Sequence, residues 1–255
     1  MSTKRSYGWR PDVPDCRDHI YLSSLGLAAA DVLPPMMDLS GGFPLPPFDQ
    51  GELGSCTANA AAGAIVFDQQ RQGLPPVMPS RLYIYYNERV IEGTVSQDAG
   101  ATIRDSVKSI NTFGACPETE WPYNIKRFAR KPSPQTYTDG KKCKAVKYAR
   151  VTRALDAMRQ CLAGGIPFLI GISVYESFES DAVAKTGVVP LPEKDETLLG
   201  GHAVVCCGYD TAERTFRCRN SWGTDWGVTG YFTLPFEYLL DPNLSDDFWV
   251  VQSVA

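Results

Sequence analysis

The first half of the chain places apolar residues at the spacing of amphipathic helices. Three such stretches are visible, at residues 56–72, 80–92 and 102–113, and each is followed by a glycine. The second and third begin at Ser80 and Thr102, residue types that commonly cap helix N-termini. We therefore predict three helices, which together form a mainly helical lobe over residues 33–150.

The pattern changes after residue 150. One further helix is predicted at 152–163, where a glycine pair follows. Beyond it come short apolar runs that are bounded by turn residues, which is typical of strands. These runs lie at 166–174, 202–209, 215–220, 230–234 and 248–254. We expect them to form an antiparallel sheet that curls into a barrel over residues 151–255, so that the fold is α+β with two lobes facing each other across a cleft.

Residues 1–32 stand apart from both lobes. Prolines interrupt this leader, and a short helix is predicted at 23–30. Residues 34–50 are rich in proline and glycine, which predicts an irregular entry into the first helix. Residues 126–150 are basic, and we interpret them as a solvated connector, with an acidic partner or an anion as the alternative.

Composition narrows the class of protein. The chain has 255 residues, 44% hydrophobic and 21% charged, and a formal net charge of −4. This balance argues against nucleic-acid binding, and the sequence contains no apolar run that could span a bilayer. Neither a secretory signal nor a metal-binding Cys-x-x-Cys pair is visible. We expect a cytoplasmic monomer with no metal, no cofactor and no membrane partner, and mostly free thiols among its eight cysteines.

One cysteine has a position that favours chemistry. Cys56 opens the first predicted helix, where the helix dipole favours thiolate over thiol. Gly54 and Ser55 before it add little bulk, and the amide of Gln50 could point back toward the sulfur. A lone cysteine at a helix start is more often a structural residue, so the assignment depends on a base elsewhere in the chain.

A histidine and an asparagine far downstream supply that support. His202 follows a glycine pair at the start of a predicted strand, and Asn220 begins an Asn-Ser-Trp-Gly run. A nucleophile and a base that are far apart in sequence can meet when the chain folds. Taken singly, His202 and Trp222 would be interpreted as structural residues. A metal site formed by His202, Cys206 and Cys207 is disfavoured, because Cys206 and Cys207 are adjacent on a strand and their side chains point to opposite faces.

In this order and approximate spacing the chain resembles the papain-like cysteine peptidases, of the bacterial branch that includes xylellain. The resemblance spans residues 33–255 and makes them one catalytic domain overall. The residues that carry it are Gln50, Gly54-Ser55-Cys56, Trp121-Pro122-Tyr123, Gly201-His202-Ala203-Val204, Gly208-Tyr209 and Asn220-Ser221-Trp222-Gly223 with Trp226-Gly227. Two positions depart from the family, because Leu53 replaces a cysteine and Thr57 an aromatic residue.

The resemblance implies an endopeptidase that works through an acyl-thioester. Cys56 would be the nucleophile, His202 the general base and then the general acid, and Asn220 the group that orients the imidazole. Gln50 and the Cys56 backbone N–H would form the oxyanion hole. The implied substrate-binding residues are Gly100, Gly171, Gly200, Gly201 and Trp222.

These implied roles lead to further expectations. Gly100 would pair with the backbone of an extended polypeptide, while Gly171 and Gly200 would leave a roomy pocket for bulky apolar side chains, unless the loop 187–199 closes over it. The leader takes the place of a propeptide, as in a zymogen, and would lie along the cleft and limit substrate entry; a surface strap is the alternative. Transpeptidation, deamidation and a silent papain-fold binding protein also stay open.

Overall fold

The computed structural model describes residues 5–22 and 33–254. The α-helices are α1 (Cys56–Arg71), α2 (Arg81–Glu92), α3 (Ile103–Phe113), α4 (Pro134–Gly140), α5 (Leu155–Ala163), α6 (Asp181–Thr186) and α7 (Phe236–Leu240). The strands are β1 (Met36–Asp38), β2 (Lys144–Arg150), β3 (Phe168–Tyr175), β4 (Leu198–Asp210), β5 (Thr215–Arg219), β6 (Tyr231–Pro235) and β7 (Ser245–Val254). Three short 3-10 helices are η2 (Ser40–Gly42), η3 (Ile125–Arg127) and η4 (Glu176–Glu179).

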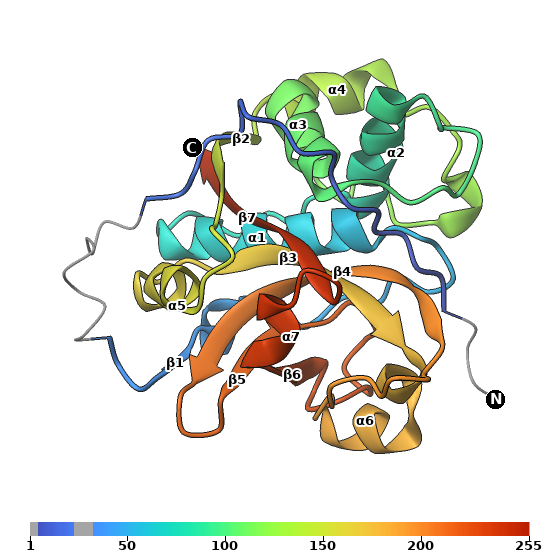
Figure 1. Cartoon of the computed structure of the whole chain (residues 1–255). Helices are drawn as coiled ribbons and strands as arrows, with labels where there is room; N and C mark the ends of the chain where they lie inside the picture. The colour runs from blue at the N-terminus through green and yellow to red at the C-terminus, as the bar shows by residue number, and fades with distance from the viewer. Residues whose placement is uncertain (1–4, 23–32, 255) are drawn as a thin grey trace.

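The three helices predicted in the first half are confirmed as α1, α2 and α3, and their ends follow local chemistry. The Ser80 side chain accepts a hydrogen bond from the backbone of α2, and that of Thr102 does the same for α3. Gly93 ends α2 in the left-handed conformation, with φ of 71°. Figure 1 shows α2, α3 and α4 gathered on one side of the molecule, with α1 running between them and the sheet.

The strands form one antiparallel sheet of seven strands in the order β2-β7-β3-β4-β5-β6, with β1 paired to β4. The predicted barrel is wrong, because the sheet stays open among the described residues. The leader lies beside the free edge of β2 at one residue. The backbone of Arg150 in β2 accepts from Tyr21 and donates to His19, both at 2.7 Å.

Two strands lie where the sequence predicted none. The basic connector at 126–150 ends in β2, which pairs with β7 along its length. The alternation of apolar and polar residues expected of a strand is hard to see in β2, because it is an edge strand and carries lysines. The three-residue β1 carries little pattern of its own and depends on its pairing with β4.

The sheet separates two hydrophobic cores. On β4, Val204 and Cys206 face one core, which contains α5 and α7, while Ala203 and Val205 face the other. This second core joins the sheet to α1, α2 and α3. Ala203 faces the core that contains α1, and its neighbour His202 therefore points to the opposite face of β4.

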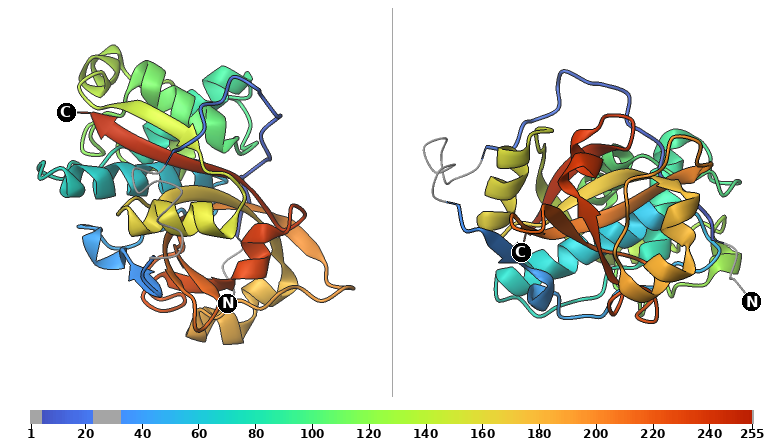
Figure 2. Two further views of the ribbon diagram at one scale, coloured as in Figure 1. Left: turned by 60° about the vertical axis from the view of Figure 1, so that its left-hand side comes forward. Right: turned by 60° about the horizontal axis from the view of Figure 1, so that its bottom comes forward.

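The leader runs over the outside of the molecule from the sheet to the helices. It is dark blue in Figures 1 and 2 and runs past the sheet and then past α2 and α3. The helix predicted at 23–30 lies outside the described residues. Among the described residues, the helices are too short or too polar to cross a bilayer.

Candidate active site

Cys56 is the first residue of α1 and is completely buried. Hydrogen bonding from the backbone N–H groups of Ala203 on β4, Gly8 in the leader and Thr57 acts to lower the pKa of its thiol. Burial raises the pKa of the thiol to about 11, which outweighs the lowering effect of these hydrogen bonds. The thiol is therefore protonated at neutral pH while the leader is in place.

His202 and Asn220 are brought together by the pairing of β4 with β5. His202 Nε2 lies 2.8 Å from Asn220 Oδ1, and this same oxygen accepts from the backbone N–H of Ser221 at 2.8 Å. Because Oδ1 is an acceptor, Nε2 carries the proton and Nδ1 of the neutral ring carries the lone pair. Nδ1 is buried and has no hydrogen-bond partner among the described residues.

Trp222 lies against the imidazole ring of His202. The two ring centroids are 5.0 Å apart and the planes are inclined by 30°. His202 is fully buried, and burial lowers its pKa to about 4 although the Asn220 hydrogen bond acts in the opposite direction. The imidazole is therefore neutral at pH 7.

Gln50 is fixed beside the same group. Its Oε1 accepts from Ser221 Oγ at 2.6 Å, and its backbone N–H donates to the Ser221 carbonyl at 2.9 Å. With the amide oriented in this way, Nε2 donates hydrogen bonds to the carbonyls of Leu53 at 3.0 Å and Ser6 at 3.1 Å. The amide that was expected to serve as an oxyanion donor thus holds a peptide carbonyl of the leader.

The leader pairs with both walls of the site through its backbone. Trp9 donates to the carbonyl of Gly201 on β4 at 2.9 Å. On the helical side Ala101 donates to Gly8 at 2.7 Å and accepts from Arg10 at 3.1 Å. The backbone pairing expected at Gly100 is thus found, toward the leader, at the next residue.

The glycines named from the sequence lie under the leader. A Cβ atom on Gly171 would come within 1.9 Å of the Trp9 indole, one on Gly201 within 2.3 Å of the Trp9 carbonyl oxygen, and one on Gly100 within 2.0 Å of the Gly8 carbonyl oxygen. Gly200 lies similarly beneath Tyr7. The recess expected at Gly171 and Gly200 is therefore filled by leader side chains, and the Arg5 guanidinium lies 4.3 Å from the centre of the Trp222 ring.

Gln50 and Cys56 contact two successive peptide units of the leader. The Gln50 amide holds the carbonyl of Ser6, which belongs to the Ser6–Tyr7 peptide unit. The Cys56 sulfur faces the N–H of Gly8, which belongs to the next unit.

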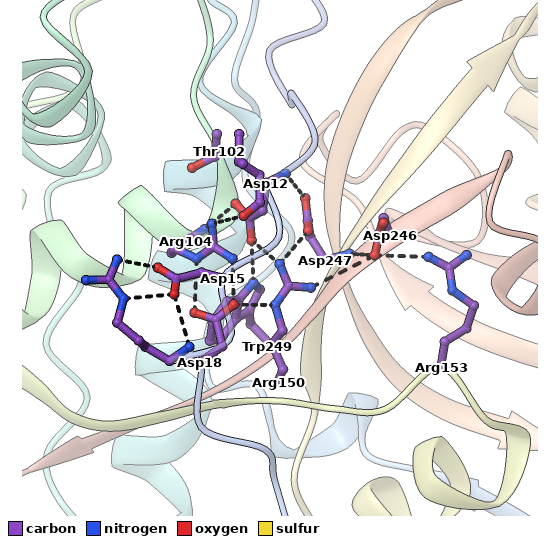
Figure 3. Close-up of polar contacts among 12 residues, drawn as sticks. Asp12, Asp15, Asp18, Thr102, Arg104, Arg150, Arg153, Asp246, Asp247 and Trp249 are labelled. Atoms are coloured by element: carbon purple, nitrogen blue, oxygen red, sulfur yellow. Dashed lines mark hydrogen bonds and ion pairs between the residues drawn. The ribbon is translucent and has the colours of Figure 1, made fainter.

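A cluster of buried charges, which we call the clamp, holds the leader further along (Figure 3). It comprises Asp12 and Asp18 of the leader, with Arg104, Arg150 and Asp247 of the body. Asp12 Oδ2 accepts from Arg150 at 2.7 Å, and Asp18 Oδ2 accepts from Arg150 at 2.8 Å and from Arg104 at 2.5 Å. The clamp joins the leader to both α3 and β2.

Asp247 links the clamp to the recess under Trp9. Its Oδ2 accepts from the Trp9 indole at 3.1 Å and from the backbone of Asp12 at 2.7 Å, and its Oδ1 accepts from Arg150 at 3.0 Å. Burial, with a further contribution from the charge of Asp12, raises the pKa of Asp247 to about 7.

Sequence reasoning missed several residues that hold the site. Ser221 lies in the Asn-Ser-Trp-Gly run, which was a signal for its position but not for its bond to Gln50. Tyr85, Asp98 and the leader backbone had no local signal, because their contacts join segments that are far apart in the chain. The described residues contain no group of three metal-ligating side chains.

Comparison with known proteins identifies the family. The family model described as papain family cysteine protease matches residues 45–238. The chain belongs to the papain family. Within this family it resembles an uncharacterized peptidase C1-like protein of Acanthamoeba polyphaga mimivirus, with 44% identity over 216 residues that cover 81% of this chain and 70% of the relative.

Solved structures agree with the family assignment. The crystal structure of xylellain, a cysteine protease from Xylella fastidiosa, is 43% identical with a TM-score of 0.91 and full coverage of both chains. Procathepsin B of Trypanosoma congolense, at 15% identity and a TM-score of 0.73 over 98% of this chain and 87% of its own, shares the fold. This papain-family chain is therefore a cysteine-type peptidase.

Proposed function

We propose that the chain is an endopeptidase in which Cys56, His202, Asn220 and Gln50 perform acyl transfer, and that its leader restrains it. The observation that carries the proposal is the Gln50 amide holding a peptide carbonyl beside a buried thiol and a histidine with a free lone pair. This pocket already binds extended polypeptide through backbone pairing, with Gly201 and Ala101 as partners.

The reaction follows from these positions. When a substrate replaces the leader, the Cys56 thiol gives its proton to Nδ1 of His202, and the thiolate attacks the scissile carbonyl carbon. Gln50 Nε2 and the Cys56 backbone N–H, a donor that the helix leaves unpaired, stabilise the oxyanion. The carbon–nitrogen bond breaks as Nδ1 returns the proton to the leaving amine. Water then attacks the thioester, passing its proton through Nδ1, and the acid leaves as the thiol is restored.

Asn220 keeps Nε2 protonated throughout and so holds the ring in the tautomer that the first step needs. Trp222 covers this hydrogen bond on one face of the ring. Asn220 does not need to carry a charge, because the negative thiolate balances the positive imidazolium. The recess under Trp9 supports a preference for substrates with a bulky side chain there.

The test uses a chain whose residues 24–29 are replaced by a site-specific protease sequence, which is cut after folding and then freed of its leader by repeated dilution and washing. We expect an epoxysuccinyl inhibitor to label Cys56 faster in the cut, leader-free protein than in the intact chain. A peptide with a bulky residue for the recess should be hydrolysed, Cys56→Ser should abolish turnover, and Gln50→Ala should lower it by about 10²–10³-fold.

Cys143→Ser is the matched control, because this half-buried thiol lies away from the site and should not matter. Absence of both labelling and turnover in a folded, leader-free protein would favour a silent binding protein. Transfer of the acyl group to an amine, or a mass gain of about 1 Da per side-chain amide, would favour a transpeptidase or a deamidase. Equal labelling of cut and intact protein would keep the peptidase and reject the restraint.

A further inference from the structure

We propose that Tyr85 and Asp98 form a bracket that fixes the nucleophile loop relative to the edge that pairs with peptide backbone. Both act as positioning residues, and the inference rests on the proposed function. The nucleophile loop is the segment 51–55 before Cys56, and the pairing edge is Gly100 with Ala101. Asp98 is hydrogen-bonded to the first of these loops and Tyr85 to the second.

Asp98 holds the nucleophile loop by its backbone. Both carboxylate oxygens lie 3.1 Å from the Gly54 nitrogen, two residues before Cys56. A Cβ atom on Gly54 would lie 3.1 Å from Asp98 Oδ1, so the carboxylate sits directly against the loop. A hydrogen bond to an ionised acceptor is about twice as strong as one between neutral groups, which suits a single point of attachment.

Tyr85 connects this carboxylate to the pairing edge. Its side chain is buried within α2, and its hydroxyl donates to Asp98 Oδ1. The same hydroxyl accepts from the backbone N–H of Gly100 at 3.1 Å. The next residue, Ala101, makes the two backbone hydrogen bonds to the leader. One hydroxyl group thus stands between the loop that carries the thiol and the edge that carries the peptide.

The hydroxyl keeps its proton under all working conditions. Burial and the hydrogen bond to Asp98 raise the pKa of Tyr85 far above its ordinary value. It can therefore donate to the carboxylate and accept from Gly100 throughout the pH range of the enzyme.

Helix α2 provides a rigid base for the bracket. The buried Arg89 guanidinium donates to the carbonyls of Val95 at 2.8 Å and Gln97 at 2.9 Å, which fixes the segment that leads into Asp98. It also lies 4.0 Å from the centre of the Tyr85 ring. Arg89 also interacts electrostatically with the carboxylate of Asp98, which is itself an exposed residue.

The bracket takes the place of a covalent tie. All eight cysteines are free, so no disulfide joins the nucleophile loop to its neighbours. Without the bracket, Gly54 can shift, and the Cys56 N–H and Gln50 shift with it. A displacement of about 1 Å at a reacting centre can cost on the order of 10²-fold in rate. Loss of the bracket should therefore lower kcat through the oxyanion donors and raise KM through the pairing edge.

Kinetics of the cut, leader-free protein test the bracket, with active sites counted by the epoxysuccinyl inhibitor. Tyr85→Phe removes one hydroxyl, and Asp98→Ala removes the acceptor. We expect each to lower kcat/KM by roughly 10–100-fold, with both a lower kcat and a higher KM. Asp98→Asn keeps one acceptor oxygen and should recover part of the loss. Tyr83→Phe is the matched control, because Tyr83 is a buried tyrosine of the same helix whose hydroxyl donates to Phe113.

Hydrogen exchange in the intact chain gives a readout that needs no activity. We expect Tyr85→Phe to speed exchange in peptides covering 51–55 and 99–102 while α3 stays as protected as in the wild type. Uniformly faster exchange over α2 and α3 would reduce the pair to a general stabilising role and overturn the bracket. So would kcat/KM within twofold of wild type in both Tyr85→Phe and Asp98→Ala. A wild-type protein that hydrolyses nothing would instead refute the proposed function, leaving the exchange result to decide the bracket.

Discussion

Burial acts on the two reactive side chains in opposite directions. It raises the pKa of the Cys56 thiol to about 11 and lowers the pKa of the His202 imidazole to about 4. Between these values both groups are neutral as long as the leader covers them. In the proposed restraint, the leader would oppose formation of the thiolate–imidazolium pair as well as access to it, because both charges need a polar environment to form.

Glu88 is a buried carboxylic acid near Cys56. It accepts from Thr57 Oγ1 at 2.8 Å, and Thr57 directly follows Cys56. Burial raises the pKa of Glu88 to about 8. The folded chain therefore binds this proton more tightly than the unfolded chain, and the free energy of unfolding falls as pH rises from about 5 to about 8, by up to ~1.4 kcal/mol per pH unit.

Glu88→Gln should remove this slope. We expect the variant to gain stability relative to wild type as pH rises from 5.5 to 8, as measured by chemical denaturation at both values. Glu120→Gln serves as the control, because that side chain is exposed. An identical pH dependence in Glu88→Gln and wild type would show that the carboxyl group is already ionised in the fold.

At the scale of elements, the leader is an extended segment held by backbone pairing at one end and by the clamp further along. Asp12 is the centre of the clamp, since it also accepts from the Trp249 indole at 2.9 Å and from the backbone of Arg104 at 3.1 Å. Removing the charge of Asp12 should weaken the binding of the leader to the body by about 1–3 kcal/mol. A change of 1.4 kcal/mol in this free energy shifts the equilibrium between bound and released leader tenfold.

Asp12→Asn in the intact chain should therefore raise the rate of Cys56 labelling by roughly tenfold or more. Asp15→Asn is the matched control, because Asp15 pairs with Arg17 inside the leader and not with the body. Peptide mapping after inhibitor treatment gives both rates. Equal rates in the two variants would mean that the clamp does not govern opening.

At the scale of the whole molecule, the leader joins the helical side to the sheet. It contacts Ala101 and Arg104 on one side and Gly201 and Arg150 on the other. We expect a chain cut within 23–32 to keep its leader during gel filtration at pH 7, and to unfold at a lower temperature once the leader is removed. The same cut in Asp12→Asn should release the leader. A leader that leaves the wild-type protein at once would show that the covalent link alone keeps it in place.

The parts of the molecule that were predictable from sequence carry their signals locally. Helix α2 begins at a serine cap and ends at a left-handed glycine, and Cys56 stands at a helix start, so each can be read within a few residues. The bond between Gly54 and Asp98 spans 44 residues and uses a backbone N–H, which has no sequence signature. Strand β2 was missed because its lysines suit an edge.

If the leader restrains the site as proposed, its covalent linkage to the same chain determines how the restraint depends on protein concentration. A tethered segment meets its site at an effective concentration in the millimolar range, whatever the concentration of the protein. The closed fraction of the intact enzyme is then unaffected by dilution, and opening is a first-order event for each molecule. A single cut within 23–32 turns the same contacts into a bimolecular complex, in which dilution favours release. One peptide bond therefore decides whether the inhibition depends on concentration.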